Sequence, residues 1–197
     1  MSKTLEFYFD FASPNCYLAY KALPDIVGTD ADMQIIPCFL GGVFKSTGNQ
    51  APMIAFSNVK GKLAYDMLEF QRFLKKHNLS KFQMNPSFPI NTLLIMRGLV
   101  AAEDQQRKYI DAVLTAMWEE GKNTGDPEAV VSIWNDAGFD APSLLKRTQD
   151  AAVKQKLFEN TEAAVARGVF GLPAFFVGDE MFFGKERLGQ VAEALIS

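Results

Sequence analysis

Ser13-Pro14-Asn15-Cys16 is the segment whose residue types and spacing most readily support chemistry. It has the outline of a redox Cys-x-x-Cys motif in which serine replaces the first cysteine. At the N-terminus of a helix, a serine hydroxyl can donate a hydrogen bond to a sulfur anion, which the helix dipole also stabilises. Ser-Pro by itself favours the simpler role of a helix N-cap, and one hydroxyl can serve both roles.

Other side chains with reactive potential are few in this chain. Cys16 has no partner thiol at position 13, and we expect both Cys16 and Cys38 to be buried packing residues. The single histidine, His77, lies in a Lys-Lys-His-Asn segment typical of an exposed helix end, so no Ser-His-Asp triad is expected. Two cysteines and one histidine cannot form a four-ligand zinc site, so no metal is predicted, although carboxylate-only sites stay open.

Composition narrows the class of protein further. With 197 residues and 48% apolar content, the chain can bury a substantial core. A net charge of −3 argues against a nucleic-acid partner, because no basic tract is present to neutralise phosphates. No run of 18 apolar residues indicates a membrane span, and Met1–Thr4 leads directly into a strand pattern rather than a signal peptide. We therefore expect a cytoplasmic protein that binds neither membranes nor nucleic acid.

Hydrophobic periodicity places the candidate motif at a junction between a strand and a helix. Leu5, Phe7, Phe9 and Phe11 alternate with polar residues, and a helix is expected from Pro14 to near Pro24. Further along the chain we expect a strand over 33–39 and an irregular connection over 40–53. Helices follow from about residue 60: the first carries the apolar stripe Leu63, Met67, Phe70 and Leu74, the next is capped by Asn91, and the others cover 106–120, 127 to Gly138, a short stretch from Pro142, and 150–167. The chain ends with strands over 174–177 and 181–183 and a helix over 186–196.

This order of elements predicts an α/β fold, namely a thioredoxin-like domain with an inserted all-helical domain. Residues 1–45 and 168–197 would form the discontinuous thioredoxin-like domain. Residues 46–167 would form the inserted helical domain.

Two later segments fit such a fold. Gly171-Leu172-Pro173-Ala174 precedes a short apolar strand, where thioredoxin-like folds place a cis-proline, and we predict a cis Leu172–Pro173 bond rather than a trans proline. The backbone of Leu172 would then be free to pair with an extended peptide. Phe183-Gly184-Lys185-Glu186-Arg187 opens the last helix, where backbone N–H groups can hold a carboxylate, and a solvated helix start is equally compatible.

Together these segments resemble the kappa-class glutathione transferases and the bacterial 2-hydroxychromene-2-carboxylate isomerases. The resemblance runs nearly end to end, and the order of its motifs is fairly specific for that superfamily. The segments that carry it are Phe7-Tyr8-Phe9-Asp10-Phe11-Ala12-Ser13-Pro14-Asn15-Cys16-Tyr17-Leu18, Phe44-Lys45-Ser46-Thr47-Gly48-Asn49-Gln50-Ala51-Pro52, Met84-Asn85-Pro86, Phe170-Gly171-Leu172-Pro173 and Gly178-Asp179-Glu180-Met181-Phe182-Phe183-Gly184.

The resemblance implies roles for particular residues. Ser13 matches the serine that contacts and activates the glutathione sulfur, and Leu172 matches the residue whose backbone pairs with the cysteinyl part. Asn85 matches the region that meets the substrate in the isomerases, and their substrate-binding lysine falls at Phe44 or Lys45, depending on a one-residue shift. The resemblance thus implies that residues 1–45 and 168–197 bind glutathione and that residues 46–167 line the cleft for the acceptor substrate. Two positions depart from the family pattern: Lys185-Glu186 replaces Asn or Ser followed by Asp, and Ile54-Ala55 replaces an Asn-Arg pair. The glutathione-binding residues implied are Ser13, Asn15, Asn49, Leu172, Pro173, Phe183, Gly184, Lys185 and Glu186.

From these residues we predict a glutathione-dependent isomerase, with glutathione as cofactor, acting on a small aromatic or electrophilic substrate from aromatic catabolism. A kappa-class transferase or peroxidase that consumes glutathione is the main alternative. A disulfide oxidoreductase is disfavoured by serine at position 13, and a glutathione or peptide binder without catalysis is a further alternative. The family's habit implies a homodimer.

Overall fold

The computed structural model describes residues 3–28 and 32–197. Met1 and Ser2, which belong to the segment predicted not to be a signal peptide, lie outside the described residues. The elements of the described residues are, in chain order, β1 (Leu5–Phe9), α1 (Pro14–Val27), β2 (Met33–Pro37), α2 (Leu40–Thr47), α3 (Pro52–Ala55), α4 (Lys62–Lys76), α5 (Leu93–Ala101), the 3-10 turn η1 (Glu103–Gln105), α6 (Gln106–Trp118), α7 (Pro127–Asp136), α8 (Ala141–Arg147), α9 (Ala151–Ala166), β3 (Ala174–Val177), β4 (Glu180–Phe183), the 3-10 turn η2 (Lys185–Arg187) and α10 (Leu188–Ile196).

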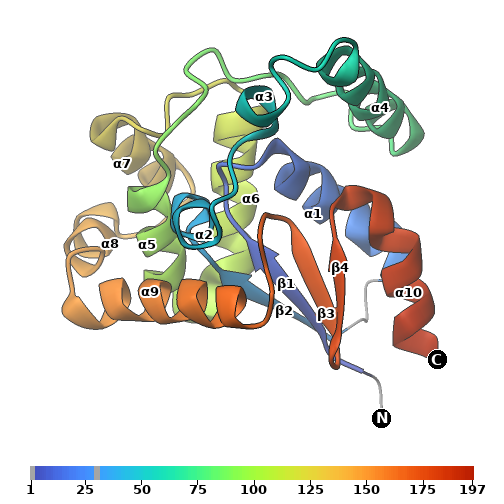
Figure 1. The fold of residues 1–197 in the computed structure, drawn as a ribbon. Coiled ribbons are helices and arrows are strands. Elements are labelled where there is room, and N and C mark those ends of the chain that lie inside the picture. Colours follow the sequence, from blue (N-terminus) through green and yellow to red (C-terminus); the bar gives the residue numbers. More distant parts are fainter. Residues whose placement is uncertain (1–2, 29–31) are drawn as a thin grey trace.

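The four strands form one mixed sheet in the order β2-β1-β3-β4. β1 pairs parallel with β2 and antiparallel with β3, and β3 and β4 form the predicted hairpin. Leu5, Phe7 and Phe9 are fully buried, as their alternation predicts, and Phe9 faces Tyr20 of α1. Helices α1 and α10 pack together beside the sheet, while most other helices lie on its opposite side (Figure 1). The α/β, thioredoxin-like fold class is confirmed.

The other face of the sheet carries the polar side chains of β1. The Arg167 guanidinium lies 3.8 Å from the centre of the Phe176 ring, forms an ion pair with Glu6 and donates a hydrogen bond to the Tyr8 hydroxyl at 2.6 Å. This residue follows α9 directly, so the contact anchors the end of the helical region to the sheet. Helices α5 and α9 also contact β2.

Helix α1 begins where the Ser-Pro pair predicts and extends further than expected. Ser13 is its N-cap, and the serine Oγ accepts a hydrogen bond from the Cys16 N–H at 3.3 Å. Pro24 does not end the helix, which continues to Val27. Proline removes one backbone donor, but the surrounding turns still bond, and the Gly28 N–H reaches the Pro24 carbonyl at 3.1 Å.

The expectation of an irregular connection over 40–53 is wrong, because α2 and α3 occupy much of it. Two glycines, which have low helix propensity, obscure the pattern in the sequence. At Gly42 a Cβ would lie 3.1 Å from Thr161 Cγ2, so glycine lets α2 lie close against α9. The predicted domain boundary at residue 45 falls inside α2, and the division into two domains stays a prediction.

Helix α4 is only partly covered by the rest of the molecule. Of the stripe predicted from the sequence, Phe70 is buried, whereas Leu63 and Met67 are exposed. Figure 1 shows α3 and α4 at the top of the fold, with α3 above α2 and α4 above α1 and α10. Eight large apolar residues of this segment each expose more than a third of their surface, and we call them the α3–α4 apolar surface: Met53, Ile54, Phe56, Val59, Leu63, Tyr65, Met67 and Leu68.

The remaining helices form an apolar core of their own and join it to the sheet. Tyr109 on α6 is fully buried and donates a hydrogen bond to the Ile95 carbonyl at 2.8 Å. The indole of Trp118 donates to the Phe11 carbonyl at 3.1 Å, next to the end of β1. The N-cap position of α5 is Thr92 rather than the predicted Asn91, although Asn91 Oδ1 does accept a hydrogen bond from the Leu93 N–H at 3.0 Å. Among the described residues, we find no helix with the length and apolar character to cross a membrane.

Candidate functional site

The Ser13 hydroxyl lies at the centre of the candidate site, at the N-terminus of α1. It is buried and donates a hydrogen bond to the Leu172 carbonyl at 2.9 Å. The Leu172–Pro173 bond is cis, as predicted. The Pro173 carbonyl in turn accepts a hydrogen bond from the Gly184 N–H at 3.0 Å. Three segments far apart in the sequence therefore meet here, namely the start of α1, the cis-proline turn and the turn after β4.

Asn49 and Phe183 flank this cis-proline turn. Asn49 Nδ2 donates to the Phe170 carbonyl at 2.7 Å, and the rings of Phe170 and Phe183 lie 4.5 Å apart. A Cβ at Gly171 would lie 3.0 Å from the Phe183 ring, so the ring covers the turn at a distance that only glycine permits without adjustment. Both aromatic rings are partly exposed and form an apolar rim beside Leu172.

Lys185 and Glu186 are neighbours with opposite exposure. The Lys185 side chain is buried, forms an ion pair with Glu186, and lies 5.9 Å and 5.5 Å from the ring centres of Phe70 and Phe73. The Glu186 side chain is about half exposed, and its Oε2 would lie 3.0 Å from a Cβ at Gly184. Lys185 therefore faces α4, while the Glu186 carboxylate lies over the turn that bonds to Pro173.

Asn15, in the first turn of α1, is half-buried. Its Oδ1 is buried and has no hydrogen-bond donor among the described residues. A buried acceptor without a donor is uncommon in folded proteins, because desolvation of the oxygen is then uncompensated.

The two residues predicted to bind the acceptor substrate lie in different surroundings. Lys45 is exposed in the last turn of α2. Asn85 is buried, donates to the carbonyls of Met117 and Lys122 at 2.7 and 2.8 Å, and accepts from the Ser87 N–H at 2.8 Å. The Asn85 side chain thus fastens the loop before α5 to the end of α6, and both of its amide hydrogens are used in doing so.

Asp10 is a residue of this region that the sequence did not single out. Its carboxyl group is fully buried and accepts three hydrogen bonds, from the Ala12 and Leu40 N–H groups and the Thr92 hydroxyl. Burial raises its pKa to about 6, and the three hydrogen bonds oppose that shift. The available signal was an acidic residue on the polar side of an alternating strand, which usually indicates solvent exposure.

Both cysteines are buried and unpaired with each other, as expected from the sequence. Burial raises the pKa of the Cys16 thiol and of the Cys38 thiol well above the ordinary value. A thiol that stays protonated is a poor nucleophile. The segment that resembles a redox motif therefore contains no reactive thiol.

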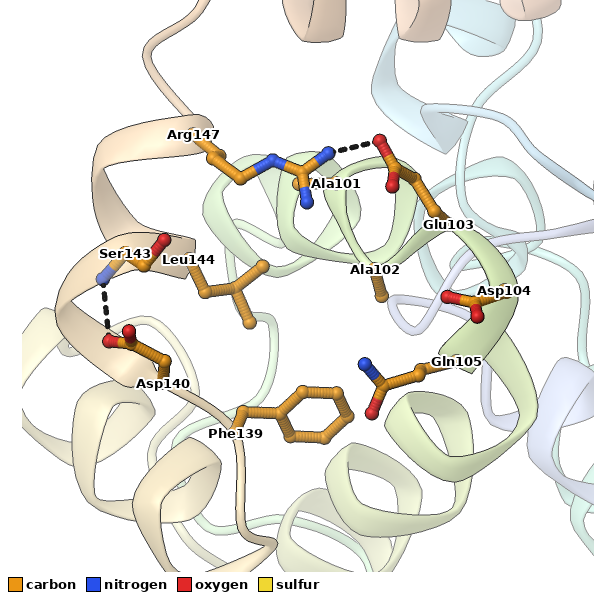
Figure 2. A pocket seen from close by; sticks show the side chains of 10 residues that line it. All are labelled: Ala101, Ala102, Glu103, Asp104, Gln105, Phe139, Asp140, Ser143, Leu144 and Arg147. Atoms are coloured by element: carbon orange, nitrogen blue, oxygen red, sulfur yellow. Dashed lines mark hydrogen bonds and ion pairs between the residues drawn. The ribbon is translucent and has the colours of Figure 1, made fainter.

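Two cavities lie away from Ser13. One, of about 140 Å³, has an apolar floor of Phe139 and Leu144, and the ion pair between Glu103 and Arg147 crosses its edge (Figure 2). The other, of about 780 Å³, lies over β2 and is also lined by Glu6 and Tyr8 of β1. Neither is lined by Ser13, Leu172 or Gly184.

Comparison with known proteins places the chain in a family. The family model described as DSBA-like thioredoxin domain matches residues 4–196. A 2-hydroxychromene-2-carboxylate isomerase of Pseudomonas putida is 30% identical, covering 97% of this chain and 93% of that protein. The glutathione S-transferase kappa 2 of Caenorhabditis elegans is 27% identical, covering 98% and 92%.

The fold agrees with these relatives. A solved structure of a 2-hydroxychromene-2-carboxylate isomerase superposes with a TM-score of 0.82, at 28% identity, covering 98% of this chain and 94% of that chain. The match covers nearly the whole length of this chain and of each of these proteins. It belongs to the DSBA-like thioredoxin domain family, alongside the 2-hydroxychromene-2-carboxylate isomerases and kappa-class glutathione transferases.

Proposed function

We propose that this protein is a glutathione-dependent isomerase of the 2-hydroxychromene-2-carboxylate isomerase type, acting on a small aromatic intermediate in the cytoplasm. The observation that carries the proposal is the hydrogen bond between Ser13 Oγ and the Leu172 carbonyl at the start of α1. It brings together a hydroxyl donor, a helix N-terminus and a backbone carbonyl that suits an extended peptide.

The residues present fit glutathione on three counts. The orphaned Asn15 Oδ1 offers an acceptor to a peptide N–H group. Leu172 offers its backbone beside a hydroxyl that can rotate from its carbonyl to a sulfur. The half-exposed Glu186 carboxylate offers a partner for an ammonium group. When bound, glutathione would supply the nucleophilic thiol that this chain lacks.

Each residue of the site has a distinct task in this proposal. Ser13 donates a hydrogen bond to the sulfur, and the N-terminus of α1 favours its negative charge. Asn49 fixes the turn that carries Leu172 and Pro173 by bonding to the Phe170 carbonyl. The remaining contacts to glutathione are assigned to Asn15, Phe183, Gly184 and Glu186, with Lys185 orienting the Glu186 carboxylate through their ion pair.

On the acceptor side, Lys45 is proposed to attract the carboxylate of the substrate, because its ammonium group is exposed at the end of α2. Asn85 shapes the facing loop, since its amide is already bonded to the backbone of α6 and of the residues after it. Residues 46–167 would then supply the wall of the cleft, with residues 1–45 and 168–197 binding glutathione.

Substitution of Ser13 tests the proposal. In the Ser13→Ala variant we expect kcat to fall about 100-fold, because one preorganised donor to a developing anion is lost. Glutathione affinity by calorimetry should change less than about threefold. Ser143→Ala, at an exposed serine on α8, is the matched control and should behave as the unsubstituted protein. Unchanged turnover in Ser13→Ala would remove Ser13 from the proposed mechanism.

A kappa-class transferase that consumes glutathione is the second candidate, favoured by the full-length match to kappa-class relatives. The two reactions differ in stoichiometry. An isomerase regenerates glutathione, so its concentration stays constant during turnover. Depletion of glutathione in proportion to product would support the transferase instead.

We further propose that the protein is a homodimer that covers the α3–α4 apolar surface. Eight large side chains, each roughly half exposed, present on the order of 800 Å² of apolar area. That is the area that one partner contributes to a standard protein interface. Exposed apolar side chains in such number commonly mark a surface that contacts another protein.

A further inference from the structure

Asp10 is a fully buried charged group that lies three residues before Ser13. Its Oδ1 accepts hydrogen bonds from the Ala12 N–H at 2.9 Å and the Thr92 hydroxyl at 2.7 Å, and its Oδ2 accepts from the Leu40 N–H at 2.7 Å. Neither the described ion pairs nor the groups that shift its pKa supply a positive partner for this carboxylate. The titratable groups near enough to interact with it are the thiols of Cys16 and Cys38, both protonated.

The three donors belong to three different segments of the site. Ala12 lies in the turn that leads into α1, and its bond to Asp10 closes the turn that sets the Ser13 backbone. Leu40 is the first residue of α2, whose N-cap position, Phe39, has no side chain that can cap the helix. The Asp10 carboxylate caps α2 in its place.

Thr92 provides the third link. It occupies the N-cap position of α5, where threonine usually bonds to its own helix, yet its side chain makes no such cap. The hydroxyl donates to Asp10 instead, across 82 positions of sequence. One carboxylate thereby ties the start of α1 to the starts of α2 and α5.

In the proposed function, these helices carry residues on two sides of the site, the side of the glutathione thiol and the side of the acceptor substrate. Helix α1 begins at Ser13, which faces the sulfur of glutathione in the proposed function. Helix α2 carries Lys45, while α5 follows the loop that Asn85 fastens. A shift at the Asp10 junction would therefore move the acceptor side relative to the thiol, without removing any group that touches glutathione.

We propose that Asp10, acting through Thr92 and the N-terminus of α2, is the positioning residue that holds the acceptor side of the site in register with Ser13. This inference rests on the proposed glutathione-dependent function. Asp10 touches no reacting atom in it. Its contribution is to alignment, and loss of alignment lowers kcat more than it lowers affinity.

The first experiment isolates the Thr92 link. Thr92→Val removes the hydroxyl at nearly constant volume, and kcat should fall about tenfold while glutathione affinity stays within about twofold. The Thr92→Ser variant keeps the hydroxyl and should restore most of the lost turnover. The control is Thr124→Val, because Thr124 is also fully buried and its hydroxyl makes no hydrogen bond within the described residues. Equal losses of kcat in Thr92→Val and Thr124→Val would overturn the inference.

A second measurement does not depend on glutathione. In the Asp10→Asn variant, amide hydrogen exchange at Leu40 should accelerate at least about tenfold, because the asparagine cannot accept from both the Ala12 and Leu40 N–H groups and from Thr92 at once. Exchange at Phe7, in the centre of the sheet, should stay slow. Unchanged protection at Leu40 would refute the junction even if glutathione binds. If the protein does not bind glutathione but Asp10→Asn loses protection at Leu40, the proposed function is refuted and the junction is established.

Discussion

The Ser13 hydroxyl has one hydrogen to donate, and in this structure the Leu172 carbonyl receives it. Binding of a thiol would therefore exchange one hydrogen bond for another rather than add one. An exchange of this kind contributes little net affinity, because both states are hydrogen-bonded. What changes is the identity of the acceptor, so the effect of Ser13 should appear in reactivity of the sulfur more than in binding.

The burial of Asp10 leads to a prediction about how the unfolding free energy depends on pH. Its pKa is about 6 in the folded protein and 3.8 when unperturbed, so the folded state binds the proton more tightly between these values. Tighter proton binding by Asp10 in the folded protein therefore adds to the unfolding free energy. This addition is fully present below pH 3.8 and is lost as the pH rises through 6. Relative to Asp10→Asn, the unfolding free energy should fall by about 3 kcal/mol across this range. Urea unfolding at a series of pH values measures it, and a constant difference between the two proteins would contradict it.

At the scale of elements, the packing of α5 on α6 depends on one glycine. A Cβ at Gly98 would overlap the Tyr109 hydroxyl and lie 2.8 Å from Trp134 Cζ2, and both rings are fully buried. Gly98→Ala should therefore lower the unfolding free energy by about 1–3 kcal/mol, despite alanine's higher helix propensity. Thermal unfolding tests this. The control is Gly189→Ala on α10, where nothing lies within 4 Å of the added carbon and a small gain is expected. A gain in Gly98→Ala as well would mean that the rings can move aside.

Elements with regular apolar periods were predictable from the sequence, and those determined by tertiary contacts were not. β1 follows its alternating apolar pattern, and the long helix α9 lies within the expected range of 150–167. Helix α2 was missed because Gly42 serves close packing against Thr161, and because the cap of the helix is the carboxylate of a distant residue. Both facts depend on chain segments that local sequence does not reveal.

The same distinction applies to the site. Ser13 and Pro173 were found because a Ser-Pro pair and a proline before a strand have local conformational meaning. The burial of Lys185 under α4 was not foreseeable, because a lysine at a helix start is usually solvated. The role of Thr92 was hidden for a similar reason, since a threonine at an N-cap normally serves its own helix.

For the whole molecule, the α3–α4 apolar surface should determine the oligomeric state. Met67→Glu places a charge in the middle of that surface and should convert the proposed dimer to a monomer. Sedimentation velocity at micromolar concentration measures this. Phe158→Glu is the control, because Phe158 is at least as exposed as Met67 but lies on α9. A monomer before substitution would contradict the proposed interface directly.

The two cysteines of the chain are buried and hold their protons at neutral pH. Reactivity toward peroxides and alkylating agents requires an accessible thiolate, so neither residue is a target for oxidative damage in the folded state. The cysteines of the folded protein therefore offer no site for oxidation or alkylation. In the proposed function, oxidative conditions would then reach turnover through the supply of reduced glutathione rather than through a thiol of the protein.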